Sequence, residues 1–153
     1  MKSLALCTCE KVIIDKAGAH SLINLILNAE LQLAQGIEEV PRNAVNPYQW
    51  FIYSAWVPSS EDVGEHFEQV FQIYWPDGQK FFENKLGFTQ PDESVQQVSF
   101  GIVGFPIGQT GRMKILTWLE KKGSRVTEVG EANIVIKHIP QTADTTAAAT
   151  TER

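Results

Sequence analysis

The stretch HFEQVFQIYWPDGQKFFENKLGF, residues 66–88, decides the fold that the sequence predicts. It reads as two strands joined by a tight turn, in which Pro76 presets φ and Gly78 can adopt the left-handed conformation. Apolar side chains share one face of each arm: Phe67, Phe71, Ile73 and Trp75 before the turn, and Phe82, Leu86 and Phe88 after it. A lone hairpin is marginal in water, so the rest of the chain must cover this face.

The other segments predict more strands of the same kind, because apolar residues alternate between turns that contain Gly or Pro. Residues 20–33 show the clearest alternation and are predicted as one strand, with Ile26 as the exception to the pattern. Further strands are expected over residues 4–15, 48–57, 95–105, 112–121 and 126–139. The sequence therefore predicts an all-β fold, an antiparallel β-sandwich of about eight strands with little helix.

The length of 153 residues suits one domain. We expect residues 1–140 to form a single β-sandwich domain. Residues 141–153 contain no aromatic and no large aliphatic side chain. Such a segment cannot bury enough apolar surface to offset the entropy lost on ordering, so it is predicted to be a flexible C-terminal tail.

Charge and cysteine content bear on partners and compartment. The net charge of −5 argues against a nucleic-acid partner, since phosphate binding requires a basic surface. No apolar run approaches the roughly 20 residues of a membrane span, so no membrane partner is expected. Cys7 and Cys9 lie two apart on a predicted strand, where a disulfide would be strained. Two unpaired thiols suit a reducing compartment, and the expected localisation is cytoplasmic.

The sequence shows no motif typical of catalysis. There is no Gly-x-Ser-x-Gly elbow, and the glycine-rich run at 101–111 lacks the Gly-Lys-Ser/Thr of a phosphate loop. His20, His66 and His138 do not have the spacing of a zinc site. We therefore expect no catalytic residues, no cofactor and no metal, while an enzyme site assembled only by the fold stays an open alternative.

Aromatic side chains are the first candidates for ligand contact. Trp50 and Trp56 on one predicted strand could stack against a sugar, although a tryptophan is more often part of the core. Trp118 shares a strand face with charged residues, so we expect it to be partly exposed and to mark a contact surface.

The acidic loop at residues 61–68 is the second candidate. Glu61, Asp62 and Glu65 are weak candidates for calcium ligands. Calcium needs several oxygen ligands, usually from more than one loop, so a solvated charged loop is the simpler interpretation.

The opening segment LALCTCEKVIIDKAGAHSLINL, residues 4–25, resembles the start of a family of small bacterial domains of unknown function. The shared pattern is an apolar strand with Cys, an acidic residue and Val, then a Gly turn, then Ser21-Leu22-Ile23. Residues 105–119, with Pro106 and Gly111 before an alternating strand, are similar to the family's late strand. The resemblance covers residues 1 to about 140 and implies an intracellular β-sandwich without catalytic residues.

These observations predict a non-enzymatic interaction module that acts through protein–protein contacts, with another protein or with further copies of itself. The alternative is a ligand-binding module for carbohydrate or calcium, which would use the exposed aromatic side chains or the acidic loop.

Overall fold

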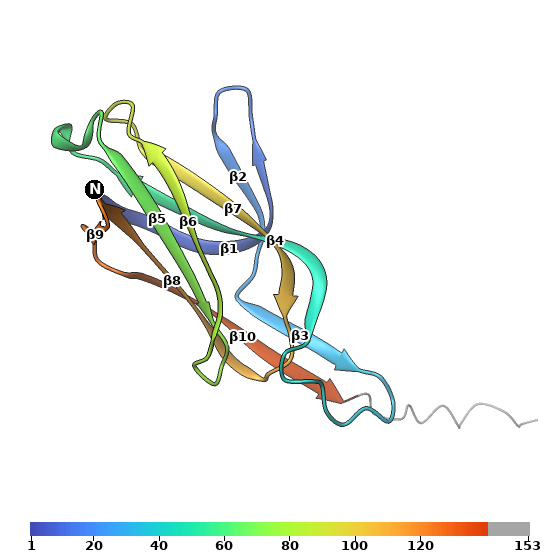
Figure 1. Cartoon of the computed structure of the whole chain (residues 1–153). Helices are drawn as coiled ribbons and strands as arrows, with labels where there is room; N and C mark the ends of the chain where they lie inside the picture. Colours follow the sequence, from blue (N-terminus) through green and yellow to red (C-terminus); the bar gives the residue numbers. More distant parts are fainter. Residues whose placement is uncertain (141–153) are drawn as a thin grey trace, which may run out of the picture.

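The computed structural model describes residues 1–140 as two β-sheets packed face to face (Figure 1). The predicted C-terminal tail, residues 141–153, lies outside the described residues. One short 3-10 turn, η1 (Ser60–Asp62), is the helical element among the described residues. The prediction of an all-β sandwich with little helix is confirmed.

The first sheet has four strands, each antiparallel to its neighbour. In spatial order they are β2 (His20–Leu25), β1 (Lys2–Ile14), β4 (Val45–Val57) and β7 (Gln96–Pro106).

The second sheet has six strands and contains the hairpin from which the prediction began. Its main path is β3 (Asn28–Leu33), β10 (Gly130–Pro140), β8 (Gly111–Lys121), β5 (His66–Tyr74) and β6 (Lys80–Thr89), and β9 (Ser124–Arg125) pairs with β8. β3 and β10 run parallel, which differs from the antiparallel arrangement that the sequence predicts. The difference is confined to one edge of the sheet.

The predicted hairpin of residues 66–88 is confirmed as β5 and β6. Phe67 pairs with Phe88, and Ile73 pairs with Phe82. Gly78 has a φ of 86°, and its N–H donates to the carbonyl of Trp75 at 2.9 Å. The local sequence therefore specifies both the turn and the register of the two strands.

The prediction that residues 20–33 form one strand is wrong. The chain leaves the first sheet at the end of β2 and joins the second sheet as β3. Asn24 has a φ of 53°, a left-handed conformation that Asn tolerates better than most residues. The break is fixed at Ile26, whose N–H donates to the Thr8 carbonyl at 2.8 Å and whose carbonyl accepts from the Thr8 hydroxyl at 2.6 Å. Ile26, the exception in the alternation, is the residue of this crossing that is buried.

The core lies between the two sheets and is rich in aromatic side chains. Trp50 and Trp56 of β4 are fully buried, as is Phe71 of β5. The ring of Phe71 stacks on Phe100 of β7 with centroids 5.1 Å apart, which joins the two sheets directly.

Candidate functional site

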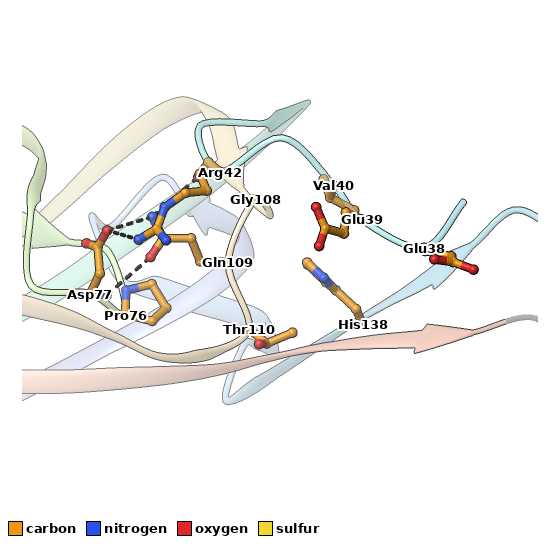
Figure 2. A pocket seen from close by; sticks show the side chains of 10 residues that line it. All are labelled: Glu38, Glu39, Val40, Arg42, Pro76, Asp77, Gly108, Gln109, Thr110 and His138. Carbon is orange, nitrogen blue, oxygen red and sulfur yellow. Dashed lines mark hydrogen bonds and ion pairs between the residues drawn. The ribbon is translucent and has the colours of Figure 1, made fainter. Parts of the chain in front are cut away.

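A pocket lies at one end of the sandwich, where three loops meet β10 (Figure 2). Its volume is about 540 Å³, within the range of small-molecule sites. The lining residues come from the β3–β4 loop, the β5–β6 turn, the β7–β8 turn and β10: Glu38, Glu39, Val40, Arg42, Pro76, Asp77, Gly108, Gln109, Thr110 and His138. We call it the loop pocket.

One end of the loop pocket is a closed polar network (Figure 2). The Arg42 guanidinium lies 2.7 Å from a carboxylate oxygen of Asp77. The Gln109 amide donates to the same carboxylate at 3.1 Å, and its oxygen accepts from the Asp77 N–H at 3.2 Å. The backbone N–H of Gln79 and the Arg42 side chain lower the pKa of Asp77. Because the two charges neutralise each other, this end holds the loops together and offers little net charge to a ligand.

Gly108 explains how the loops approach so closely. A Cβ at this position would lie 2.4 Å from the carbonyl oxygens of Pro41 and Arg42. Only glycine fits such a contact with backbone atoms. The β7–β8 turn is therefore seated directly on the β3–β4 loop.

His138 lines the other end of the loop pocket, apart from the Arg42–Asp77 pair (Figure 2). Its Nε2 lies 2.6 Å from the carbonyl oxygen of Ile107. A carbonyl can only accept, so Nε2 carries the proton and Nδ1 is the free acceptor when the ring is neutral. A catalytic base needs a nucleophile or an orienting acid within reach. Among residues 1–140, no hydrogen bond or ion pair joins His138 to Glu39 or Thr110.

A second feature is the hairpin formed by the end of β1 and by β2, which stands out from the body of the sandwich in blue (Figure 1). We call residues 11–25 the arm. Four large aliphatic side chains of the arm are between 37% and 56% exposed: Ile13, Ile14, Ile23 and Leu25. The arm is anchored through His20, whose ring contacts Tyr53 of β4 with centroids 5.7 Å apart.

The predicted tryptophan site is not assembled at the surface. Trp50 and Trp56 have no exposed surface, because both are packed in the core between the sheets. The Trp50 Nε1 donates to the Gly104 carbonyl at 3.2 Å. Trp118 is partly exposed, as expected, and its Nε1 donates to Glu120 at 3.0 Å. The three side chains do not form a common stacking face, since Trp118 lies on the outer face of the other sheet.

Two carboxylates of the acidic loop form ion pairs with cationic groups of the protein itself. Asp62 accepts from the Met1 amine at 2.6 Å and from the Ser59 N–H and hydroxyl at 2.8 Å each. Glu65 lies 2.9 Å from the Lys121 ammonium. Glu61 is exposed. No group of three potential metal ligands occurs in the part of the chain that the structure describes.

Cys7 and Cys9 are free, as the strand geometry predicts. Cys9 is fully buried and Cys7 is partly buried. Burial raises the pKa of both thiols, and the neighbouring Cys7 adds to the effect at Cys9. A raised pKa disfavours the thiolate, so neither residue has the surroundings of a nucleophile.

Sequence reasoning missed the loop pocket and the exposure of the arm. Arg42 and Asp77 are 35 positions apart, and no motif connects them. For the arm, alternation placed Ile23 and Leu25 on one face of a strand, but it did not say that both side chains stay exposed in the described chain.

Comparison with models of protein families gives no match for this chain. Comparison with curated proteins gives no match either. The family resemblance of residues 4–25 therefore stays a prediction. Within residues 1–140, no helix has the length and the apolar character needed to cross a membrane.

Proposed function

We propose that the protein is a non-enzymatic interaction module, that the arm is its contact surface, and that its partner there is a second copy of the chain. The proposal rests on a difference between the burial that the sequence alternation predicts for two side chains and the exposure that the structure shows for them. Ile23 and Leu25 belong to the clearest period-2 alternation in the sequence, yet they are 37% and 55% exposed. Alternation of this kind is typical of a strand with one covered face. Another molecule must supply the cover.

The outer face of the six-stranded sheet differs from the arm in its surface chemistry, and this difference supports the choice of the arm as the contact surface. Its long side chains are paired within the protein: Lys85 with Glu120, and Lys80 with Glu83. Paired charges next to polar residues are typical of a surface that faces water. The arm has no comparable set of paired charges over its aliphatic side chains, and an exposed apolar patch is the usual sign of a contact site.

A second copy suits the arm because an apolar patch is complementary to itself. A two-fold axis near Ile13 would place Lys11 of each copy beside Asp15 of the other, since these residues lie about 13 Å apart along the strand. Ile13, Ile23 and Leu25 share one face of the arm, while Ile14 lies on the other. The three side chains that share a face expose on the order of 300 Å² of apolar surface per copy, which lies below a standard stable interface. We therefore expect a dimer that dissociates on dilution.

The test is light scattering after size exclusion, on the full chain over a wide range of concentration. The wild type is expected to move from the monomer mass to twice that mass as concentration rises. A variant with Ile23→Lys and Leu25→Lys is expected to stay monomeric, with an unchanged melting temperature. Val126→Lys is the matched control, because Val126 is 48% exposed but lies outside the arm. A wild type that stays monomeric, or an arm variant that still dimerises, would contradict the proposal.

A further inference from the structure

Another pocket opens on the outer face of the six-stranded sheet, beside the turn that joins β5 to β6. Its volume is about 300 Å³. We call it the turn pocket, and the lining residues used below are Tyr74, Trp75, Pro76, Arg112, Lys114 and Leu116. None of the described residues that line it is acidic. Asp77 of the same turn lines the loop pocket instead, where it pairs with Arg42.

Two cationic side chains of β8 line the turn pocket. Arg112 and Lys114 are two residues apart on the strand, so their side chains leave the same face of the sheet. The residues directly opposite them on the neighbouring strands are Tyr74, Asn133 and Val135. These three side chains are uncharged, so neither cation has a carboxylate as its cross-strand partner.

The charge of Arg112 is not compensated within the described chain. On the same face of the sheet, Lys80 and Lys85 each form an ion pair with a glutamate. No ion pair of Arg112 occurs within residues 1–140. Lys114 lies 3.9 Å from Glu131, a long contact between two side chains that are about half exposed. Such a pair is weak, so the turn pocket carries a net positive charge.

The indole N–H of Trp75 is a second and independent sign of a ligand. The Nε1 atoms of the other three tryptophans, Trp50, Trp56 and Trp118, each donate to an acceptor of the protein. Trp75 is only 8% exposed. No acceptor within residues 1–140 bonds its Nε1, and this atom is not among the buried polar atoms that are closed off from solvent. A nearly buried indole usually has a partner for its N–H, so we expect a ligand in the turn pocket to supply one.

The remaining walls of the turn pocket are apolar. Pro76 and Leu116 line it, together with Tyr74, whose hydroxyl donates to Gln72 at 2.7 Å and is therefore already engaged. Donors beside apolar walls suit an organic anion. A guanidinium group matches a planar carboxylate through two parallel hydrogen bonds. A single negative charge also fits better than a double one, because Arg112 is the cation without a partner in the described chain.

We propose that the turn pocket binds a small organic carboxylate with a planar apolar body. The Arg112 guanidinium and the Trp75 N–H donate to the carboxylate, and Lys114 adds a weaker attraction. The body of the ligand contacts Leu116 and the ring of Tyr74. The volume corresponds to about ten water molecules, so the ligand has roughly ten non-hydrogen atoms. The arm belongs to the other sheet, and carboxylate binding does not depend on dimer formation.

The test compares three probes that share a phenyl ring: benzoate, its neutral counterpart benzamide, and phenyl phosphate with its larger charge. Binding to the full chain at pH 7 is followed by NMR through the indole N–H signals of the four tryptophans. Benzoate is expected to shift the Trp75 signal to saturation with a millimolar or lower Kd. The other three signals should stay in place, since their N–H groups are bonded within the protein. Benzamide should bind at least about tenfold more weakly, and phenyl phosphate should bind no more tightly than benzoate.

Variants separate the proposed contacts from a general attraction between charges. Arg112→Gln should weaken benzoate binding at least about tenfold, and Lys114→Gln should weaken it severalfold. Arg125→Gln is the matched control, because Arg125 is an exposed arginine that does not line the turn pocket. A Trp75 signal that benzoate does not shift, or equal affinity for benzoate and benzamide, would overturn the proposal. So would tighter binding of phenyl phosphate, unchanged binding in Arg112→Gln, or an equal loss in Arg125→Gln.

Discussion

Gln69 of β5 and Trp56 of β4 connect the two sheets through the centre of the core. The Nε1 of Trp56 donates to the Gln69 Oε1 at 3.1 Å. The amide nitrogen of Gln69 donates to Ser54 at 2.7 Å and to Thr117 at 2.9 Å. Gln69 itself is fully buried, so it is a polar residue whose hydrogen bonds are supplied entirely by the protein.

Replacing Gln69 is therefore expected to destabilise the fold. Gln69→Leu leaves the Trp56 N–H without an acceptor in an apolar core, and the free energy of unfolding should fall by about 2–3 kcal/mol. Equilibrium unfolding in urea measures the change. Gln35→Leu is the control at an exposed turn and should change the free energy by less than about 0.5 kcal/mol. Similar values for the two variants would show that the network contributes no stability.

Asp62 gives a prediction about pH. Burial alone would raise its pKa, but hydrogen bonds from the Met1 amine and from Ser59 outweigh burial and lower the pKa to about 2. A carboxylate whose pKa is depressed by folding stabilises the protein above its unfolded pKa near 4. That contribution is lost as the pH falls through about 2.

The comparison of wild type with Asp62→Asn isolates this effect. At pH 5 the variant should be less stable by roughly 1–2 kcal/mol, and the difference should shrink as the pH falls from about 4 to 2. Urea unfolding at a series of pH values measures it. A difference that stays constant over this interval would show that the Asp62 carboxylate is not the group that titrates.

A substitution at Gly108 tests how closely the β7–β8 turn packs against the β3–β4 loop at the loop pocket. Gly108→Ala forces a Cβ against two carbonyl oxygens at 2.4 Å, so the loops must separate. We expect a loss of about 2–4 kcal/mol in the free energy of unfolding. Gly130→Ala is the control, since its new Cβ would meet no atom closer than 3.4 Å. An equally small change in both variants would mean that the two loops move apart freely.

The two cysteines give a chemical prediction. Both thiols have raised pKa values and Cys9 is fully buried, so the native protein should react slowly with a thiol reagent. Cys7, which is partly exposed, should react first. Reaction in guanidinium should be at least about tenfold faster than in buffer. The release of thionitrobenzoate from Ellman's reagent measures both rates. Fast labelling of two thiols in buffer would contradict the packing around β1.

The sequence predicted what depends on local pattern. The hairpin at residues 66–88 follows from the turn at Pro76–Gly78 and from the alternation of apolar and polar residues on both sides of it. Its strand register is therefore determined by residues that are close together in the sequence. Alternation over residues 20–33 did not reveal the change of sheet, because a period of two says which side chains share a face and not which sheet contains the strand. Ile26 was the one visible sign of the break.

The site was less predictable than the fold. Trp50 and Trp56 were candidates for ligand contact by residue type, but the same apolar surface that suits stacking also favours burial in the core. The loop pocket joins residues from four separate segments. Such contacts depend on the pairing of whole strands, which no short motif records.

Hydrogen exchange measured at low and high protein concentration tests the central claim most directly. The account predicts that backbone amides of residues 11–25 exchange more slowly at high concentration, while those of β6, another edge strand, do not change. Exchange in residues 11–25 that is independent of concentration, or protection that appears at β6 instead, would contradict the claim that the arm is the contact surface between two copies.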